Sequence, residues 1–410
     1  MKIAIFHLAF IYSGGGEKLV LEEAKGLVKK GHQVTVFSPV IDRKNCFPDL
    51  IGQSDVKAIL PQLPMIIPEQ RAFQVLLACV LAPLLAARFR GFDVILAANQ
   101  PSLWLALWIK KFFGVPYVAY LAQPTRFLHP RKIDLETGLI FTGRRSFLPA
   151  TFLMKMAKPL GDWVDRISIK GANLVLANGK HAKKILDRIY SLKVISCPAG
   201  AYPLAKSGNY PSRYRGVLKV DDRTISKPYL LLTNRHFPQK RFEYAITALP
   251  AILKKFPHLS LVITGGETDY TRDLKNLVKQ LSLEERIMFL GLVGEENLGR
   301  LYANTVIYVY TAPEEDFGMG MVEAMAYGTP VVAWNNGGPT GIVVNGETGF
   351  LARPFEVADF ADKIAQLLND KKLAERMGKT GLKRVKNEFS WEKHLKFLEE
   401  SFWQVKNEGS

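Results

Sequence analysis

The chain has 410 residues, of which 48% are hydrophobic and 23% charged, a balance typical of soluble globular proteins and a length too great for one ordinary core. Its three cysteines, Cys46, Cys79 and Cys197, are far apart and show no metal-ligand spacing, which argues against a disulfide framework and suggests no metal site. The net charge of +17 is concentrated in residues 1–200, which hold 27 Lys and Arg against 13 Asp and Glu, so this half should attract anionic lipid, nucleic acid or phosphorylated substrates.

The residue pattern argues against a nucleic-acid partner and against a secreted or membrane-spanning protein. No basic region, zinc finger or aromatic-basic RNA signature accompanies the positive charge, so we expect no nucleic-acid partner. The first ten residues lack a signal-peptide cleavage site, and the longest charge-free apolar run, Val75–Ala87, is shorter than the ~20 residues that span a bilayer. We therefore expect a cytoplasmic protein, peripheral on the inner face of the cell membrane.

The first half begins with a strand–helix–strand pattern. Lys2–Leu8 is apolar enough for a strand buried on both faces, a glycine turn leads into a helix that ends near Gly31, and Gln33–Phe37 is a second strand. The glycine turn, Ser13–Glu17, should lie at the carboxyl edge of a parallel sheet, where α/β proteins bind ligands. By itself such a turn is equally consistent with a simple helix cap. Further strands are predicted at Asp93–Ala97, Pro116–Leu121 and Asn173–Ala177, with helices at Pro101–Phe113 and His181–Tyr190.

Two stretches of the first half combine apolar and aromatic residues with bases. Residues 71–90 form an apolar helical run with arginines near its ends, and residues 126–170 interleave aromatic and aliphatic residues with Arg and Lys. Interfacial helices have this composition, because their apolar side enters the headgroup boundary while the bases meet anionic lipid. Core helices with solvated basic faces are the alternative.

The second half begins after a Pro-, Gly- and Ser-rich stretch, Tyr202–Lys227, which we interpret as a crossing between domains. A strand, Tyr229–Thr233, follows it and leads into a basic turn that contains Arg235 and Lys240. Two cations on a strand-to-helix turn can neutralise a leaving diphosphate. The doubly wound series then continues with helices at Tyr244–Lys255, Thr271–Leu281 and Glu295–Asn304 and strands at Leu259–Thr264 and Ile287–Leu290.

The most informative stretch is a strand, an acidic turn and a helix. Val306–Tyr310 is β-branched and aromatic, whereas Met319–Tyr327 favours a helix. Glu315 in the turn and Glu323 in the helix are separated by seven residues. Glycines at the helix start would let backbone amides approach an anion, and the carboxylates would accept hydrogen bonds from hydroxyl groups. This is the recognition chemistry of a nucleotide sugar.

The string from Glu315 to Ala333 resembles glycosyltransferase family 4, retaining enzymes of the GT-B fold. Their signature is Glu, seven residues, Glu, then Ala-Met-Ala, a Gly and Pro-Val-Val-Ala, and all of these residues are present. The resemblance implies an α/β protein with two Rossmann-like doubly wound domains facing across a cleft. The implied domains are an acceptor-binding domain at 1–202, a linker at 203–227, a nucleotide-sugar-binding domain at 228–387 and a C-terminal helix at 388–410 that packs back on the first domain.

The resemblance also assigns roles to individual residues. Glu315, Arg235 and Lys240 are the implied catalytic residues, with the two cations stabilising the departing diphosphate without a metal. The implied donor-binding residues are Glu323, Gly318, Met319, Phe317, Gly265, Gly291, Gly15 and Gly16. The acceptor or sugar candidates are Gln123, Arg126 and Glu17. No cofactor is expected beyond the GDP- or UDP-linked donor, which is a substrate.

One segment departs from the family pattern. Many members carry a His ahead of a Pro and an Arg in the central loop of the first domain, and here that position falls on Ala122 or Gln123. The main hypothesis is a metal-independent hexosyltransferase, mannosyl or glucosyl, that acts on a lipid-linked or polysaccharide acceptor in cell-envelope assembly. The alternative is a non-catalytic GT-B scaffold or partner subunit at the membrane that binds nucleotide without transfer.

Overall fold

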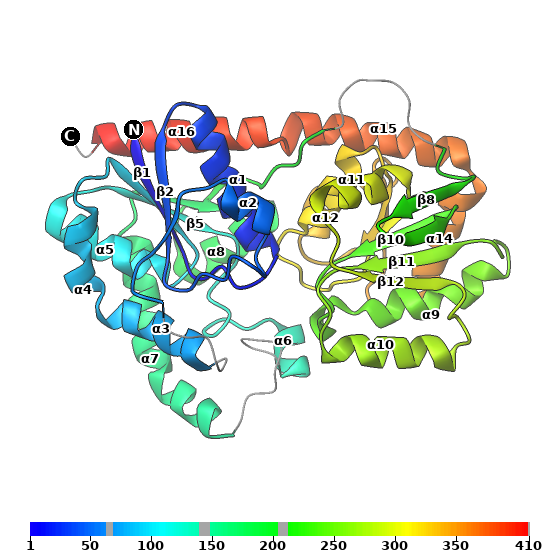
Figure 1. The fold of residues 1–410 in the computed structure, drawn as a ribbon, viewed down its shortest axis with the longest axis horizontal. Coiled ribbons are helices and arrows are strands. Elements are labelled where there is room, and N and C mark those ends of the chain that lie inside the picture. Colours follow the sequence, from blue (N-terminus) through cyan, green and yellow to red (C-terminus); the bar gives the residue numbers. More distant parts are fainter. Residues whose placement is uncertain (63–68, 139–147, 204–211, 409–410) are drawn as a thin grey trace. The chain divides into compact units, whose positions relative to one another are not determined.

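A computed structural model describes residues 1–62, 69–138, 148–203 and 212–408, with the side chains of 69 and 148–157 left out (Figure 1). The chain forms two compact units. Unit 1 comprises Met1–Arg131, Gly138–Ala199 and Trp391–Ser410, and unit 2 comprises Lys132–Thr137 and Gly200–Ser390. The aromatic and basic residues predicted to face a membrane between 139 and 157 lie outside this description.

Unit 1 is built on a seven-stranded sheet in which every neighbouring pair is parallel. Its central strands are almost entirely buried, because helices must cover both faces of a parallel sheet. In spatial order the strands are β3 (Val56–Ala58), β2 (Gln33–Ser38), β1 (Lys2–His7), β4 (Val94–Ala98), β5 (Tyr117–Leu121), β6 (Leu174–Ala177) and β7 (Ile195–Ser196).

The helices of unit 1 follow the alternation expected of a doubly wound fold. The principal ones are α1 (Gly15–Lys29), α2 (Pro48–Gly52), α3 (Glu69–Val80), α4 (Ala82–Leu85), α5 (Ser102–Phe113), α7 (Leu148–Lys170) and α8 (Gly179–Tyr190). Within the described residues no single helix is long and apolar enough to cross a membrane. One bent pair, Gln70–Val80 with Ala82–Phe89, has the required length and composition, with 66° between its two parts.

The last helix, α16 (Trp391–Glu408), belongs to unit 1 although it follows the whole of unit 2 in sequence. It is attached through His394, which is buried and lies between two parts of the first half of the chain. Its Nε2 is 3.0 Å from Glu23 Oε1 on α1, and its Nδ1 is 3.0 Å from the Pro198 carbonyl oxygen. Burial opposes protonation of this imidazole, but its buried polar neighbours outweigh that effect and raise the pKa of His394.

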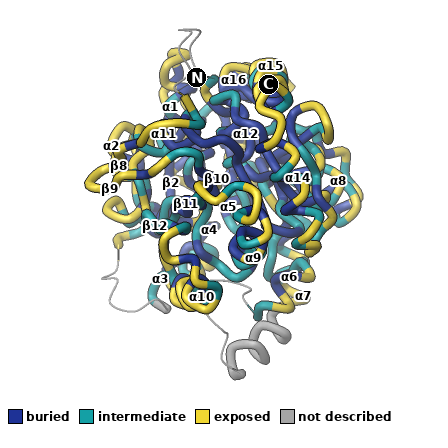
Figure 2. Tube along the Cα trace, turned by 90° about the vertical axis from the view of Figure 1, so that its right-hand side faces the viewer, coloured by how far each residue is buried: buried dark blue, intermediate teal, exposed yellow. Residues whose placement is uncertain are grey.

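Unit 2 contains a six-stranded parallel sheet. In spatial order its strands are β12 (Ile287–Gly291), β11 (Ser260–Thr264), β10 (Tyr229–Thr233), β13 (Ile307–Tyr310), β14 (Val331–Trp334) and β15 (Gly349–Ala352). Its helices are α9 (Phe242–Leu253), α10 (Asp269–Gln280), α11 (Glu295–Asn304), α12 (Met319–Ala326), α13 (Pro339–Ile342), α14 (Val357–Asn369) and α15 (Lys371–Glu388). Strands β10 and β11 are largely buried, whereas α10 exposes one side (Figure 2). The predicted pair of doubly wound α/β domains is confirmed.

Two parts of unit 2 differ from the predicted domain plan. The predicted linker contains an antiparallel hairpin, β8 (Val217–Val220) and β9 (Arg223–Ser226), which turns at Asp221-Asp222 and buries Leu218, Val220 and Ile225. The short helix α6 (Lys132–Thr137), predicted within the first domain, groups with unit 2. The Ile133 amide donates to Glu314 Oε2 at 3.1 Å, so a polar contact holds the start of α6 there.

The turn after β10 is fixed by a buried histidine, His236. Its Nδ1 is 2.9 Å from Thr271 Oγ1 in α10, and its ring packs edge-on against Phe242 and Phe289. The His236 carbonyl accepts a hydrogen bond from the Thr268 hydroxyl group. Burial among these apolar rings disfavours the imidazolium and lowers the pKa of His236 to about 4.

This histidine predicts a loss of stability in acid. Between its unfolded pKa near 6.5 and its folded pKa of about 4, the unfolded chain binds a proton that the folded chain does not. The contribution of His236 to the free energy of unfolding is therefore complete above the unfolded pKa and should fall by roughly 3 kcal/mol as the pH drops to about 4. His236→Asn keeps an acceptor for Thr271 but cannot titrate, so urea unfolding should give it a flatter profile than the wild type. Parallel profiles for the two proteins would contradict this assignment.

Candidate functional site

The acidic turn of unit 2, which contains Glu314 and Glu315, is held in place by a second turn that contains Asn336 and Gly338. The Glu314 amide donates to Asn336 Oδ1 at 2.6 Å, and the Gly338 amide donates to the Glu315 carbonyl oxygen at 2.5 Å. A Cβ atom at Gly337, whose φ is +69°, would lie 2.7 Å from the Glu315 carbonyl oxygen. These glycines therefore allow two backbone turns to touch.

The structure brings together two of the three predicted catalytic residues. Lys240 ends the short 3-10 helix η2 (Pro238–Lys240) after β10, and its Nζ lies 2.6 Å from Glu315 Oε2. The Lys240 carbonyl oxygen accepts a hydrogen bond from the Thr311 hydroxyl at 3.0 Å, which ties η2 to the start of the acidic turn. The side chains of Lys240 and Glu315 are 18% and 16% exposed, so the pair is shielded but still reachable by a ligand.

Glu323, on α12, is oriented by tyrosines that the sequence did not identify. The hydroxyl of Tyr302 donates to Glu323 Oε2 at 2.9 Å, and Thr233 Oγ1 lies within 3.0 Å of both Tyr302 and Tyr308. Burial, together with the charge of Glu323, raises the pKa of Tyr302 well above its usual value, so the phenol keeps its proton and remains a donor. No short spacing links these residues, and only the fold brings them together.

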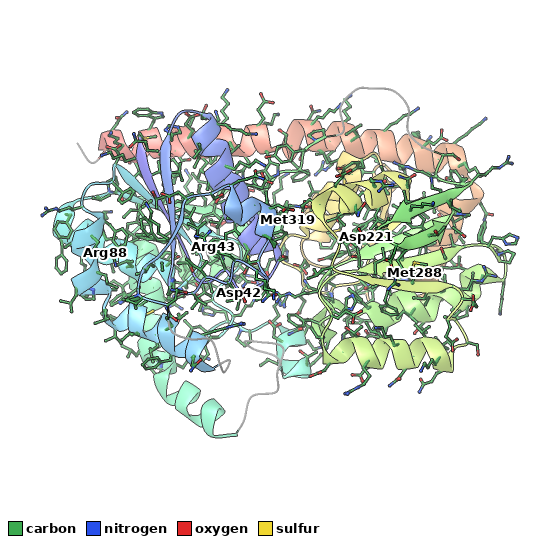
Figure 3. All side chains as sticks on the ribbon, viewed as in Figure 1. Asp42, Arg43, Arg88, Asp221, Met288 and Met319 are labelled. Carbon is green, nitrogen blue, oxygen red and sulfur yellow. The ribbon has the colours of Figure 1, made fainter. Side chains whose placement is uncertain are left out.

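The start of α12 combines a special backbone conformation with close packing. Gly318 caps the helix with a φ of +101°, and Met319 is the first helical residue (Figure 3). The first amides of a helix have no partner within it, so this end can bind an anion or a polar oxygen. The sequence also suggested that Gly320 lets a ligand approach, but a Cβ there would lie 2.3 Å from the Tyr308 hydroxyl. Packing against that tyrosine is sufficient to require glycine at 320.

The basic turn after β10 lies against the glycines predicted to bind donor. A Cβ at Gly265 would lie 1.7 Å from the Asn234 carbonyl oxygen, so the ends of β10 and β11 approach closely. The Gly265 amide donates to the Gly291 carbonyl oxygen at 2.9 Å, which joins β11 to the end of β12. Beside them the Arg235 guanidinium lies over the Phe237 ring, 4.5 Å from its centroid.

In unit 1 the predicted glycine turn forms the start of α1. Gly15 and Gly16 are its first residues, and Glu17 in its first turn is buried. Glu17 Oε1 is 3.8 Å from Nε2 of His7, the last residue of β1. Both ring nitrogens of this buried histidine lack a hydrogen-bond partner within the described part of the chain. In the sequence, His7 is marked only as a polar residue at the end of an otherwise apolar strand.

The loop after β5 carries Gln123 and Arg126 and is fixed at both ends. The Ala122 amide donates to Asn99 Oδ1 at 2.8 Å, and the Thr125 hydroxyl donates to Asp165 Oδ1 at 2.6 Å. Asp165 also accepts from the Tyr190 hydroxyl, and burial raises the pKa of this carboxyl group despite both hydrogen bonds. Asp165 was missed because it lies about 40 residues from the loop that it holds.

The predicted site residues therefore form two groups, one in each unit. In unit 2 the predicted site residues lie at or after the carboxyl ends of β10 to β13; they are Arg235, Lys240, Glu315, Glu323, Phe317, Gly318, Met319, Gly265 and Gly291. In unit 1, Gly15, Gly16, Glu17, Gln123 and Arg126 follow β1 and β5. Across the described ranges, no three His, Cys, Asp or Glu side chains gather as they would to hold a metal ion.

Comparison with known proteins supports this arrangement. Residues 13–198 match the family model described as Glycosyltransferase Family 4, and residues 221–384 match that described as Glycosyl transferases group 1. The chain is 27% identical to the alpha-1,3/1,6-mannosyltransferase ALG2 of Dictyostelium discoideum, with 95% of each chain covered. It is 26% identical to the human protein of the same name, over 92% of this chain and 90% of that one.

Solved structures share the fold of the whole chain. A sucrose-phosphate synthase from Thermosynechococcus elongatus has a TM-score of 0.77 at 20% identity, with 99% of both chains covered. The Anabaena protein HepE in complex with UDP has a TM-score of 0.74 at 19% identity, over 99% of this chain and all of that one. With both halves matched by models of one family, and with two parallel doubly wound units of the GT-B type, this chain belongs to glycosyltransferase family 4.

Proposed function

We propose that the protein transfers a hexosyl group from a nucleoside diphosphate sugar to a lipid-linked or polysaccharide acceptor, with retention of anomeric configuration. The main observation in favour of this proposal is the Lys240–Glu315 pair, which precedes the N-terminus of α12. Glu323 lies on the same helix. A mannosyl group is favoured over glucosyl because several full-length relatives are mannosyltransferases by name. The donor is GDP- or UDP-linked.

Each part of the donor has a matching group in unit 2. Glu323, held by Tyr302, accepts hydrogen bonds from ribose hydroxyls. Glu315 and the amides of residues 317–319 hold the sugar. Lys240 and Arg235 stabilise the diphosphate, and because they supply positive charge where the leaving group departs, no metal ion is required. A bound diphosphate would share Lys240 with Glu315, so donor binding and the position of this lysine are coupled.

Retention is explained by a front-face displacement. The bond between the anomeric carbon and the diphosphate oxygen breaks, and the bond to the acceptor oxygen forms on the same face of the sugar. The acceptor proton passes to the departing diphosphate, whose negative charge is stabilised by the two cations. In unit 1, Gln123 and Arg126 on the loop held by Asp165, together with Glu17, bind the acceptor or the sugar.

The acceptor side also determines where the protein works. A lipid-linked acceptor requires access to a membrane, and the excess of bases in residues 1–200 favours its anionic inner face. We therefore propose a peripheral protein on the cytoplasmic side of the membrane. The second candidate function, a scaffold that binds nucleotide without transfer, is favoured by one observation, the presence of Ala122 and Gln123 where many family members carry a histidine.

Removing the cation that contacts Glu315 should abolish most turnover. Lys240→Ala is expected to lower kcat by about 100- to 1000-fold, because a charge that stabilises the leaving group is lost while most donor contacts remain. Initial rates with a panel of nucleotide sugars would measure this effect. Lys255→Ala, an exposed lysine in the same unit, is the matched control and should retain full activity. Near-wild-type turnover of Lys240→Ala would exclude the assigned role.

Chelation should leave the reaction unaffected. Because Arg235 and Lys240 provide the charge at the diphosphate, turnover should be the same with excess EDTA as with added Mg²⁺. Initial rates after exhaustive dialysis against EDTA provide the measurement. A loss of rate that Mg²⁺ restores would show that a metal ion takes part.

Nucleotide binding should depend on Glu323. Glu323→Gln removes the charge but keeps the shape, so affinity for a nucleoside diphosphate should fall about tenfold as charged hydrogen bonds become neutral ones. The increase in Tm produced by GDP or UDP would report it, since a ligand stabilises the fold that binds it. Glu375→Gln, an exposed acid on α15, serves as the control. Equal Tm increases for the wild type and Glu323→Gln would refute the role, and the more effective nucleotide would identify the donor base.

A further inference from the structure

The helix pair α3 and α4 has an apolar outer side that no described part of the chain covers. Phe73, Leu76, Val80 and Leu84 are 56%, 60%, 68% and 77% exposed. Their spacing of three or four residues is that of one helical face. Soluble proteins rarely expose several large apolar side chains side by side, so this stripe indicates contact with another apolar phase.

The opposite side of the same helix pair packs against the core of unit 1. Ala78 on α3 and Ala82 on α4 are buried, as are Ala86 and Phe89 in the 3-10 helix η1 (Ala86–Phe89) that directly follows α4. The Gln74 side chain donates to the Pro61 carbonyl oxygen at 3.1 Å. The pair is therefore apolar on both sides but can offer only the outer one to a partner. Such a helix pair suits a surface laid against a bilayer, because insertion across it would strip the core of unit 1.

The stripe continues onto two neighbouring helices through aromatic contacts. The Trp104 indole on α5 donates to the Cys79 carbonyl oxygen at 3.1 Å, and the Trp104 ring lies 6.1 Å from the ring of Trp163 on α7. Along α5, Trp108 and Phe112 extend the row with ring centroids 5.2 Å apart. Trp163 and Phe112 are each 54% exposed. Tryptophan and phenylalanine in this setting are typical of the boundary between water and lipid.

Charge determines which partner fits this surface. Residues 70–113 contain five bases and a single acid, Asp93. That acid is already engaged, because the Lys2 amide and the Lys406 ammonium group both donate to it. Arg88, labelled in Figure 3, Arg90 and Lys111 are exposed around the stripe. A second copy of this chain would present the same positive charge and repel, whereas anionic lipid would be attracted.

From these observations we infer that the exposed faces of α3, α4 and α5, together with the part of α7 around Trp163, form the docking surface for an anionic bilayer, hereafter the docking face. The inference deepens the proposed function, because it names the surface by which a lipid-linked acceptor is reached. It also agrees with the position of the acceptor candidates in unit 1. A cavity of about 30 Å³ behind α3 and α4 is lined by Val75 and Ala82 on one side and by His7 on the other. The docking face thus lies next to the carboxyl end of β1.

Vesicle flotation tests the docking face directly. The full chain should float with phosphatidylcholine vesicles that contain phosphatidylglycerol, and much less with pure phosphatidylcholine or at high salt. The variant Phe73→Ser/Leu76→Ser/Leu84→Ser should bind the anionic vesicles at least about tenfold more weakly, because exposed apolar side chains are lost without disturbing the core. The control Leu292→Ser/Phe355→Ser/Trp403→Ser removes side chains of similar exposure from other surfaces and should bind as the wild type does.

Reversing two positive charges on the docking face provides a second, independent test. Arg90→Glu/Lys111→Glu should abolish the preference for anionic vesicles, whereas Lys372→Glu/Lys379→Glu on α15 should not. Wild-type binding by both docking-face variants, or equal losses in variants and controls, would overturn the inference. The inference would also be overturned if light scattering showed that the wild type is a dimer and the serine variant a monomer. In that case a second copy of the chain, and not a bilayer, would cover the docking face.

The outcome separates this inference from the proposed transfer reaction. Docking variants should keep the wild-type Tm and the wild-type Tm increase with nucleotide, which shows that they fold and bind donor. If the wild type binds vesicles through this face but transfers no sugar from any donor, the docking face stands and the proposed function fails. If it transfers sugar but the docking-face variants and the wild type bind vesicles equally, the function stands and the docking face fails.

Discussion

Parallel strand pairing is the constraint on which the rest of this structure depends. Every strand of the seven-stranded and the six-stranded sheet runs in the same direction as its neighbours, so all carboxyl ends meet at one edge in each unit. Each return of the chain must then be made by a helix or loop that begins at that edge. Residues distant in sequence, such as Lys240 after β10 and Glu315 after β13, become neighbours for this reason alone. The candidate site depends on the sheet topology, because no single segment of the chain contains both Lys240 and Glu315.

Short segments with a strong pattern could be predicted from the sequence. The first strand was predicted at Lys2–Leu8 and is found at Lys2–His7, and the helix predicted at Met319–Tyr327 is α12. The two carboxylates Glu315 and Glu323 were recognised because they belong to one continuous string. Residues that support them could not be found in the same way. Tyr302 and Asp165 act on partners that lie 21 and 40 positions away, and no periodicity connects such pairs.

Two glycines show what the structure adds to a sequence pattern. Gly320 was predicted to let a ligand approach the start of α12, and Gly337 lies in the turn that packs against Glu315. In the structure their Cα atoms face a tyrosine hydroxyl and a backbone carbonyl oxygen, respectively. Close internal packing therefore demands glycine at both positions, and ligand approach is at most an additional reason. A sequence pattern identifies where glycine is needed, but only the neighbouring atoms reveal why.

The placement of α16 has a consequence for how the protein is made. Unit 1 is assembled from the beginning and the very end of the chain, with His394 closing a buried contact to Glu23 and to the Pro198 carbonyl. A ribosome releases Glu23 long before it releases His394, and the complete unit 2 emerges in between. Unit 1 therefore cannot bury the side of its core that α16 covers until Trp391–Glu408 has been synthesised. The unit whose synthesis begins first thus cannot be completed until the residues of unit 2 have been made, and the apolar surface that α16 covers stays exposed until then.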